Sequence, residues 1–399
     1  MHIAIFTRVL PHHSIGGMQT VAWDLARAFS RGNRVTLVTT EIPGRPCEFE
    51  DERVHIVTIP GAAWKRYDAT WWRGARGVFE RIAPSCNAVL GVSAAANSLL
   101  SLRGRYPELA FVMQAHGTSL GEVLSKWRTR SPKSILSSAR NISWIVKDLR
   151  AYRQYDAIVA VGERVSNDMR SALIRRSLPS ERVHLIPNGI DTALFKRDLS
   201  VRSAMRKTLG WSDAAPVIVS ASRLHKQKGI DLGLNAFAAL SKTMDNARYL
   251  IVGDGPERSE LEAHASALGL KEKVRFVGSV QRDVLPRYLQ TGDVLLFTTR
   301  HVEGLPLNVL EALAVGLSCV VSRHLFRDAD FGRWLTRVQA QDESAVADGL
   351  RSALEVGTAA SGVLPQHYSL DTCVDSYLAL FERLNAQRAM PIWMGGSRV

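Results

Sequence analysis

The chain has 399 residues, of which 46% are hydrophobic and 22% are charged, with 51 lysines and arginines against 38 acidic residues. This composition excludes a disordered or collagen-like chain, and the length predicts two or three globular units. No apolar run approaches the ~20 residues of a membrane-spanning helix, and the four scattered cysteines fit reduced thiols in a cytoplasmic protein.

The positive charge is concentrated in the first half of the chain. Residues 1–195 contain 26 lysines and arginines against 16 acids, a net charge of +10, whereas residues 196–399 contain 25 against 22, a net charge of +3. A basic half predicts an anionic partner, such as a phosphate-bearing substrate, an acidic lipid surface or nucleic acid. The alternative is a proteome that is generally rich in arginine.

Short β-branched runs alternate with helical patterns along the first half, beginning at the N-terminus with a strand rather than a signal peptide. Strands are predicted at residues 2–8, 34–40, 54–59, 88–92, 111–114, 157–161 and 183–186. Helices are predicted at residues 20–30, 93–102, 143–154 and 164–175. This alternation is typical of an α/β unit with a parallel sheet that is covered on both faces.

The pattern restarts after a turn signal at residues 188–191, and the polar residues 196–213 are predicted to connect two units. Further strands are predicted at 217–221, 249–252, 274–277, 294–298 and 318–321. Further helices are predicted at 232–242, 257–268, 283–290, 307–315 and 370–384. Two such domains facing one another would place a central cleft at the carboxyl ends of their strands.

The segment from Glu303 to Glu311 follows a predicted strand and opens a helix. Glu303 and the N–H groups after it are predicted at the helix N-terminus, where an anion is favoured. Glu311 lies eight residues later and is expected on nearly the same helical face, where its carboxylate would suit the vicinal diol of a ribose. Alternatively, Glu303 merely completes the helix end and Glu311 is a solvated surface residue.

A second candidate segment, residues 222–229, directly follows the predicted strand 217–221. Arg223 offers a planar guanidinium for bidentate contacts, and Lys228 offers a point charge five residues later. Together they could hold a diphosphate. The alternative is a basic surface loop.

Taken in chain order, these segments resemble a known family. Arg223-x4-Lys228-Gly229, residues 252–256 (VGDGP), residues 274–278 (VRFVG) and Glu303-x7-Glu311 resemble the donor-binding half of retaining glycosyltransferases of family 4, which have the two-domain GT-B fold. Residues 186–191 (IPNGID) resemble the end of the family's N-terminal domain. The Gly16-Gly17 pair resembles the family's glycine-rich loop.

The resemblance implies a domain organisation and roles for the donor-binding residues. Residues 1–195 would form the acceptor domain, residues 196–366 the nucleotide-sugar domain, and residues 367–399 a helix returning to the first domain, with a tail. Arg223 and Lys228 would hold the donor diphosphate, and Glu311 would bind the ribose. Glu303 would contact the hydroxyls of the donor sugar, with N–H groups supplied by Gly304 and Leu305. The nucleobase would be bordered by Gly253, Gly255 and Val277.

Three residues of the first half also receive roles from the resemblance. Gly16 and Gly17 would let the backbone approach the phosphate or the transferred sugar. His116, after the strand 111–114, matches a histidine that the family places near the donor sugar, although a lone histidine there is more often structural. Residues 323–332 depart from the family pattern, because a charged stretch stands where a glycine-rich segment with a glutamate is usual.

The chemistry implied is transfer of a hexose with retained configuration and without a metal or other cofactor. The sequence shows no DxD-type carboxylate pair and no metal-ligand spacing. Because neither the sequence nor the family motif supplies a clear carboxylate nucleophile, the resemblance implies the family's front-face mechanism, in which the leaving diphosphate helps to deprotonate the acceptor. The alternatives are a nucleotide-sugar epimerase and a catalytically silent scaffold subunit of a glycan-assembly complex.

The acceptor side is predicted from two segments that mix tryptophan with basic residues, 64–76 and 126–153. Such segments are typical of surfaces that meet anionic headgroups, although ordinary packing is an alternative. The expected partners are a nucleotide-sugar donor, a glycan or lipid-linked acceptor and an anionic membrane surface. No nucleic-acid motif is present. The expected location is the cytoplasm, with peripheral attachment at the inner face of the membrane.

Overall fold

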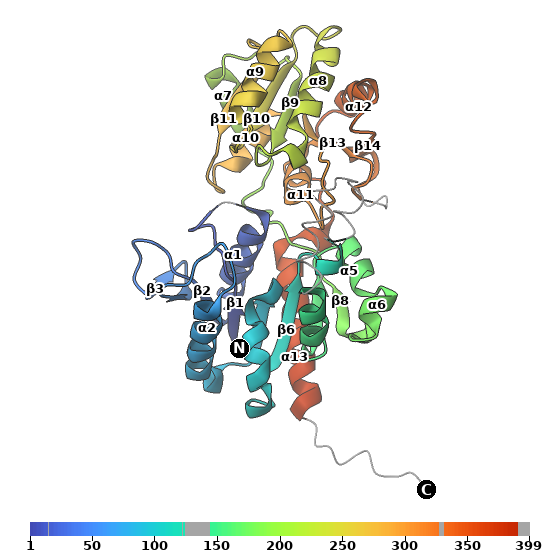
Figure 1. Ribbon diagram of the computed structural model, residues 1–399. Helices are drawn as coiled ribbons and strands as arrows, with labels where there is room; N and C mark the ends of the chain where they lie inside the picture. Colours follow the sequence, from blue (N-terminus) through green and yellow to red (C-terminus); the bar gives the residue numbers. More distant parts are fainter. Residues whose placement is uncertain (15, 122, 124–143, 327–330, 390–399) are drawn as a thin grey trace. The chain divides into compact units, whose positions relative to one another are not determined.

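The computed structural model describes residues 1–14, 16–121, 123, 144–326 and 331–389, and the chain divides into two units (Figure 1). The first unit combines Met1–Gly189 with Leu370–Val399, and the second unit is Ile190–Ser369. The predicted domain limits at residues 195 and 366 lie a few residues from these divisions.

The first unit is built on an eight-stranded sheet with the order β3-β4-β2-β1-β5-β6-β7-β8. Neighbouring strands are parallel, except that β3 runs antiparallel to β4 at the edge. The strands are β1 (His2–Phe6), β2 (Arg34–Thr40), β3 (Glu48–Asp51), β4 (Val54–Ile59), β5 (Ala88–Val92), β6 (Ala110–Ala115), β7 (Ala157–Ala160) and β8 (Val183–Leu185). The sequence predicted each of these strands except β3.

Helices connect these strands, and residues 144–152 are also helical. They are α1 (Gly17–Phe29), α2 (Ala69–Ile82), the 3-10 helices η1 (Ala83–Ser85), η2 (Ser93–Arg105) and η3 (Ser180–Arg182), α5 (Glu163–Met169), α6 (Ala172–Arg175) and α13 (Leu370–Ala389). Three predictions were wrong in detail. Residues 93–102 belong to a 3-10 helix, the helix expected at 164–175 is broken between α5 and α6, and α2 was not predicted.

The last helix, α13, returns to the first unit, as the sequence predicted. It packs beside α1 and β6, and Figure 1 shows it in red among the blue and green elements of that unit. The ring of Phe29 in α1 lies 6.0 Å from the ring of Tyr377 and 6.2 Å from that of Phe381. Aromatic pairs at such distances stabilise the packing beyond the apolar area that they bury.

The second unit contains a six-stranded, fully parallel sheet with the order β11-β10-β9-β12-β13-β14. Its strands are β9 (Val217–Ala221), β10 (Arg248–Val252), β11 (Val274–Gly278), β12 (Val294–Phe297), β13 (Ser318–Ser322) and β14 (Leu335–Val338). Side chains of β9 alternate between two apolar clusters: Val217 and Val219 belong to one, and Ile218 belongs to the other. The sheet is therefore buried on both faces, as predicted for a parallel sheet.

The connections of the second unit supply these two apolar layers. They are α7 (Leu199–Thr208), η4 (Lys226–Lys228), α8 (Ile230–Ser241), α9 (Arg258–Ala267), α10 (Leu285–Thr291), α11 (Leu307–Ala314), η5 (Gly332–Trp334), α12 (Glu343–Val356) and η6 (Gln366–Tyr368). Helices α8 and α12 share one cluster, whereas α11 contributes to the other. Helix α12 and strand β14 were not predicted from the sequence.

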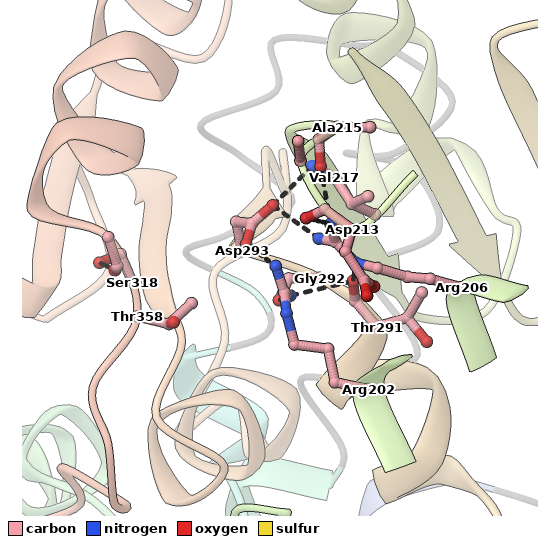
Figure 2. A network of polar contacts seen from close by, with 12 residues as sticks. Arg202, Arg206, Asp213, Ala215, Val217, Thr291, Gly292, Asp293, Ser318 and Thr358 are labelled. Atoms are coloured by element: carbon pink, nitrogen blue, oxygen red, sulfur yellow. Dashed lines mark hydrogen bonds and ion pairs between the residues drawn. The ribbon is translucent and has the colours of Figure 1, made fainter. Parts of the chain in front are cut away.

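The prediction that residues 196–213 form a polar connector was wrong, because they contain α7. Arg206 of α7 is completely buried, and Figure 2 shows its guanidinium among backbone oxygens. It donates to the carbonyls of Asp213 at 2.6 Å and Ala215 at 2.8 Å, and to Asp293 Oδ2 at 2.8 Å. Arg202 pairs with the other carboxylate oxygen of Asp293 at 2.7 Å. A polar helix can pack here because its buried charges are paired and hydrogen-bonded.

Candidate functional site

Lys228 and Glu303 meet at the carboxyl ends of β9 and β12. Lys228 ends η4, and its Nζ lies 2.7 Å from Glu303 Oε1. The hydroxyl of Thr299, two residues after β12, lies 3.2 Å from the same carboxylate oxygen. The side chains of Lys228 and Glu303 are 27% and 16% exposed, so the pair is partly open to solvent. The structure thus brings together a cation and a carboxylate that the sequence placed in separate segments.

A glycine makes this meeting possible. Gly229 has a φ of +67°, and a Cβ atom there would lie 2.1 Å from the carbonyl oxygen of Thr298. Only glycine combines a left-handed conformation with so close an approach between two backbones. The Thr298 hydroxyl also donates to the Gly229 carbonyl at 2.7 Å. Gly229 therefore joins the loop after β9 to the end of β12 and fixes the position of Lys228.

Arg223 lies in the same loop but is exposed. Within the described residues, no hydrogen bond or ion pair is recorded for its side chain. The backbone around it is held by hydrogen bonds from Ser222 N to Val252 O at 3.0 Å and from Leu224 N to Asp254 O at 2.9 Å. The guanidinium of Arg223 thus projects from a fixed backbone and can form bidentate bonds to a phosphate.

Gly253 and Gly255 are required by the packing of these two loops. A Cβ atom on Gly253 would lie 2.0 Å from Ser222 O, and one on Gly255 would lie 2.2 Å from Leu224 O. The nucleobase contact expected for this segment stays a prediction, because packing alone accounts for both glycines. Val277, at the end of β11, is partly buried against the apolar cluster of that face.

The expectation that Glu303 and Glu311 share a helical face was wrong. Helix α11 begins at Leu307, so Glu303 lies in the preceding loop with Gly304 and Leu305. Glu311 is not a solvated surface residue either, because it is 3% exposed. Its Oε1 accepts a hydrogen bond from Arg282 Nη1.

Arg282 is a residue of this site that the sequence interpretation missed. Its guanidinium lies 4.8 Å from the ring centroid of Phe195, so it contacts both an aromatic face and the Glu311 carboxylate. The available signal was weak, because Arg282 lies in a polar turn between β11 and α10 that carries no spacing pattern of its own. Asn308 is a second missed residue, and its Nδ2 donates to Ala221 O at 3.0 Å, which ties α11 to the end of β9.

In the first unit, Gly16 directly precedes α1 and Gly17 is the first residue of the helix. Gly16 is the N-cap residue, and no side chain caps the helix end. A Cβ atom on Gly16 would lie 2.7 Å from Gln19 Oε1. The first N–H groups of α1 can therefore serve an anionic or hydroxyl-bearing ligand.

His116 follows β6 and belongs to a neutral hydrogen-bonded chain. Its Nε2 lies 3.0 Å from Gln114 Oε1, and Gln114 Nε2 donates to the hydroxyl of Tyr377 at 2.9 Å. Because an amide oxygen only accepts, His116 Nε2 carries the proton and Nδ1 is left as an acceptor. Burial lowers the pKa of His116 to about 4. The ring is therefore neutral at physiological pH.

The tryptophan-containing segment 64–76 divides between core and surface. Trp71 is completely buried in α2, and its Nε1 donates to Ala95 O at 3.1 Å, so the packing alternative holds for this residue. Trp72 stacks on Tyr67 at 4.9 Å. Trp64 is only partly buried, and Lys65 Nζ lies 5.3 Å from its ring centroid. Most of the other segment, 126–153, lies outside the described residues, as do residues 327–330 of the departure at 323–332.

The described residues offer neither a metal site nor a membrane-spanning helix. No three His, Cys, Asp or Glu side chains in this part of the chain are arranged to hold a metal ion. Likewise, none of its helices combines the length and apolar character needed to cross a membrane.

Two family models match consecutive parts of the chain. The model described as Glycosyltransferase Family 4 matches residues 15–194. The model described as Glycosyl transferases group 1 matches residues 201–357. The two matches thus cover most of the first unit and most of the second.

The chain is also similar to individual proteins of this kind. It is 27% identical over 333 residues to a GDP-mannose-dependent alpha-(1-6)-phosphatidylinositol monomannoside mannosyltransferase of Mycolicibacterium smegmatis, covering 80% of this chain and 87% of the relative. It is 24% identical to an alpha-D-kanosaminyltransferase of Streptomyces kanamyceticus, covering 68% and 70%. The structure resembles sucrose-phosphate synthase from Thermosynechococcus elongatus with a TM-score of 0.72 at 18% identity, covering 97% and 96%. At that identity the structural likeness concerns the fold alone.

Proposed function

The chain belongs to the family-4 glycosyltransferases and has their GT-B fold, and from this premise we propose that it transfers a hexose from a nucleotide-diphosphate sugar to a cell-surface glycan or lipid-linked acceptor. The transfer retains the anomeric configuration and uses no metal ion. The observation that carries the proposal is the pairing of Lys228 Nζ with Glu303 Oε1 at 2.7 Å, with Lys228 in the loop after β9 that also carries the exposed Arg223.

In this proposal, Lys228 and Arg223 stabilise the leaving diphosphate. An ammonium group has three donors, so Lys228 can bind a phosphate oxygen and still hold Glu303 in place. Fixed cations at the position where negative charge develops lower the barrier, because they need no reorganisation during the reaction. Glu303 then accepts hydrogen bonds from hydroxyls of the donor sugar, next to the N–H groups of Gly304 and Leu305.

Glu311 binds the ribose hydroxyls through its carboxylate. One oxygen is held by Arg282, and the carboxylate has remaining acceptor sites for a vicinal diol. Arg282 is a positioning residue here, because it orients Glu311 rather than contacting the reacting atoms. The nucleobase lies against the loops of Gly253, Gly255 and Val277.

On the first unit, Gly16 and Gly17 offer N–H groups to the phosphate or the sugar, and His116 offers Nδ1 as a neutral acceptor. A histidine whose pKa is about 4 is a weak base at neutral pH. We therefore assign deprotonation of the acceptor hydroxyl to the leaving diphosphate, with attack from the same face of the sugar. His116 orients a hydroxyl of the donor sugar and takes up no proton during the reaction.

Charge and the relatives support the proposed acceptor and cellular location. The first unit carries 29 lysines and arginines against 18 acids, a net charge of +11, whereas the second carries 22 against 20, a net charge of +2. The mycobacterial relative is named for a phosphatidylinositol monomannoside acceptor. We place the enzyme in the cytoplasm, attached to the anionic inner face of the membrane through its basic first unit.

The decisive experiment screens nucleotide sugars for transfer to lipid-linked acceptors in the presence and absence of a chelator. NMR of the product reports the anomeric configuration. We expect turnover that resists chelation and gives a retained linkage. Inversion, or loss of turnover restored by a divalent ion, would contradict the mechanism, and sugar interconversion with donor alone would indicate an epimerase.

Membrane attachment is tested separately by co-sedimentation with vesicles. Binding to anionic vesicles should fall steeply with added salt, because exposed charges are screened within ~8 Å at physiological ionic strength. Equal binding to neutral vesicles, or binding indifferent to salt, would reject the attachment without affecting the proposed transfer reaction.

A further inference from the structure

A cavity of about 560 Å³ opens on the first unit, away from every residue assigned to the reaction. Its lining contains three arginines and one acid, Arg103, Arg182, Arg388 and Asp156, and we call it the arginine pocket. The other lining residues are Gly104, Pro107, Leu384 and Gln387. Three arginines and one aspartate therefore line an open space of the size that small ligands occupy.

The pocket lies at the amino edge of the first sheet. Asp156 directly precedes β7, and Arg182 directly precedes β8. His116, by contrast, follows the carboxyl end of β6, which is the neighbour of β7. A strand of six residues spans roughly 20 Å, so the pocket and His116 lie at opposite edges of one sheet. A ligand in the pocket is thus not the sugar that is being transferred.

Two of the three arginines have structural contacts that leave donors unused. Asp156 Oδ1 accepts from both Arg103 and Arg388, and Asp156 Oδ2 accepts from Phe111 N at 2.7 Å. Arg388 also donates to the carbonyl of Pro107, which ties the end of α13 to the unit. A guanidinium has five N–H donors, so both arginines keep several that these contacts do not use.

Arg182, unlike the other two arginines, makes no close contact within the described part of the chain that would explain its position as purely structural. Its Nη1 reaches only the carbonyls of Arg153 and Tyr155, at 3.4 and 3.5 Å, the long limit of a hydrogen bond. Within the described residues it has no recorded acidic partner. Burial lowers the pKa of Arg103, and the nearby charges of Arg388 and Arg182 lower it further against the opposing effect of Asp156. Positive charge is therefore crowded here, and a bound anion would relieve it.

We propose that the arginine pocket binds a phosphate-bearing anion, separately from the donor site. Planar guanidinium groups bind phosphate oxygens through pairs of parallel hydrogen bonds. Asp156 cannot satisfy all the donors of the pocket, because its carboxylate already binds Arg103 and Arg388. The same chemistry suits a soluble phosphate or diphosphate and the phosphate of an anionic lipid headgroup.

The test uses the full chain carrying Lys228→Ala, so that the predicted diphosphate contact of the second unit is removed. Calorimetric titration with inorganic pyrophosphate should still show binding. Adding Arg182→Gln should weaken it about tenfold or more, since a hydrogen bond to a charged group is lost. Arg175→Gln is the matched control, because Arg175 ends α6, is exposed and does not line the pocket.

A second arm distinguishes the source of the phosphate. The same variants are sedimented with vesicles of phosphatidylcholine, with and without phosphatidylglycerol. Pyrophosphate binding that depends on Arg182 indicates a soluble ligand, and vesicle binding that depends on Arg182 without pyrophosphate binding indicates a headgroup. If neither probe responds to Arg182→Gln, or if Arg175→Gln has the same effect, the proposal is overturned. Thermal unfolding of each variant verifies that the fold is retained.

Discussion

Each unit has an aspartate directly before an interior strand of its sheet, and both aspartates are held in the same way. Asp156 precedes β7 and accepts from Phe111 N of the neighbouring strand at 2.7 Å. Asp293 precedes β12 and accepts from Val217 N of its neighbouring strand at 2.8 Å. Each carboxylate also binds two arginines. The two clusters therefore share one local arrangement, in which an aspartate before a strand binds an N–H group of the neighbouring strand and two arginines.

The two clusters differ in what surrounds their arginines. Arg206 is completely buried, and backbone carbonyls take up its remaining donors, so the cluster in the second unit is closed. Arg103 is 34% exposed, and its cluster opens into the cavity that Arg182 also lines. The closed cluster holds α7 against the sheet, whereas the open one keeps guanidinium donors for a ligand. The same pairing therefore serves stability in one unit and recognition in the other.

The carboxyl edges of the two sheets differ in a second way. In the second unit this edge carries ion pairs, Lys228 with Glu303 and Arg300 with Asp231 at 2.6 Å. In the first unit the corresponding edge carries the neutral chain of His116, Gln114 and Tyr377. Ionic groups suit a diphosphate whose charge grows during the reaction, whereas a neutral chain suits sugar hydroxyls.

The largest effect is expected for the closed cluster. Arg206→Ala leaves the carbonyls of Thr291, Asp213 and Ala215 without their buried donor and removes one of the two arginine partners of Asp293, which should destabilise the second unit by about 3–5 kcal/mol. Arg103→Ala should cost about 1 kcal/mol or less, because Arg103 is partly exposed and Arg388 still pairs with Asp156. Urea titration with peptide-level hydrogen exchange assigns each loss to its unit. Equal losses would contradict the distinction between closed and open clusters.

The next largest effect, on catalysis, is expected at the carboxyl edge of the second sheet, which carries the ion pairs. Lys228→Ala should lower kcat/KM by about 2–4 kcal/mol of transition-state stabilisation, because the charge of the leaving diphosphate is left uncompensated. Nucleoside diphosphate binding should weaken, while nucleoside binding should barely change. The control is Lys226→Ala, which removes an exposed lysine of the same 3-10 helix. Turnover near that of the wild type in Lys228→Ala would reject the donor-site assignment.

The neutral chain at the carboxyl edge of the first sheet leads to a prediction about the pH dependence of stability. The pKa of His116 is lowered by burial from 6.5 to about 4, so the unfolded chain takes up a proton below pH 6.5 that the folded chain takes up only near pH 4. His116 should therefore reduce the stability of the first unit as the pH falls from 6.5 toward 4, by no more than about 3 kcal/mol, and should have no such effect above pH 6.5. The difference in urea midpoint between wild type and His116→Gln, followed across this range, measures the contribution. An NMR titration midpoint near 6.5 for the His116 ring would contradict it.

The sequence was most informative where one local pattern determines one element. Buried strands such as β2, β4 and β9 were predicted with their observed limits, because β-branched runs between turn signals have few alternatives. The resemblance to the family rested on several motifs that follow one another in the expected order along the chain, most of them in the second unit. Lys228 and Glu303, which those motifs indicated, do lie together in the structure.

The failures share a physical cause, which is that tertiary partners override local polarity. Residues 196–213 were interpreted as a connector because nothing in the sequence shows that Asp293 and distant carbonyls will satisfy Arg206. For Trp71 the sequence left a surface role and ordinary packing open, because a segment rich in arginine surrounds it, and the structure shows packing. Arg282 was missed because its partner Glu311 lies 29 positions away. The arginine pocket was missed for the same reason, since Arg103, Arg182 and Arg388 meet only in the folded chain.

The smallest effects come from one substitution made in each unit, with opposite signs. In the second unit, Gly255→Ala places a Cβ atom 2.2 Å from Leu224 O, so the loop that carries Arg223 must shift, at a cost of about 1–3 kcal/mol. In the first unit, Gly77 lies on the exposed face of α2 with no atom within 4 Å of its added Cβ. Gly77→Ala should therefore stabilise by about 0.5–1 kcal/mol, because alanine loses less backbone entropy in a helix. Urea midpoints measure both changes, and KM for the donor should rise only in Gly255→Ala. A Gly255→Ala variant as stable as the wild type would show that the loop contact does not require Gly255.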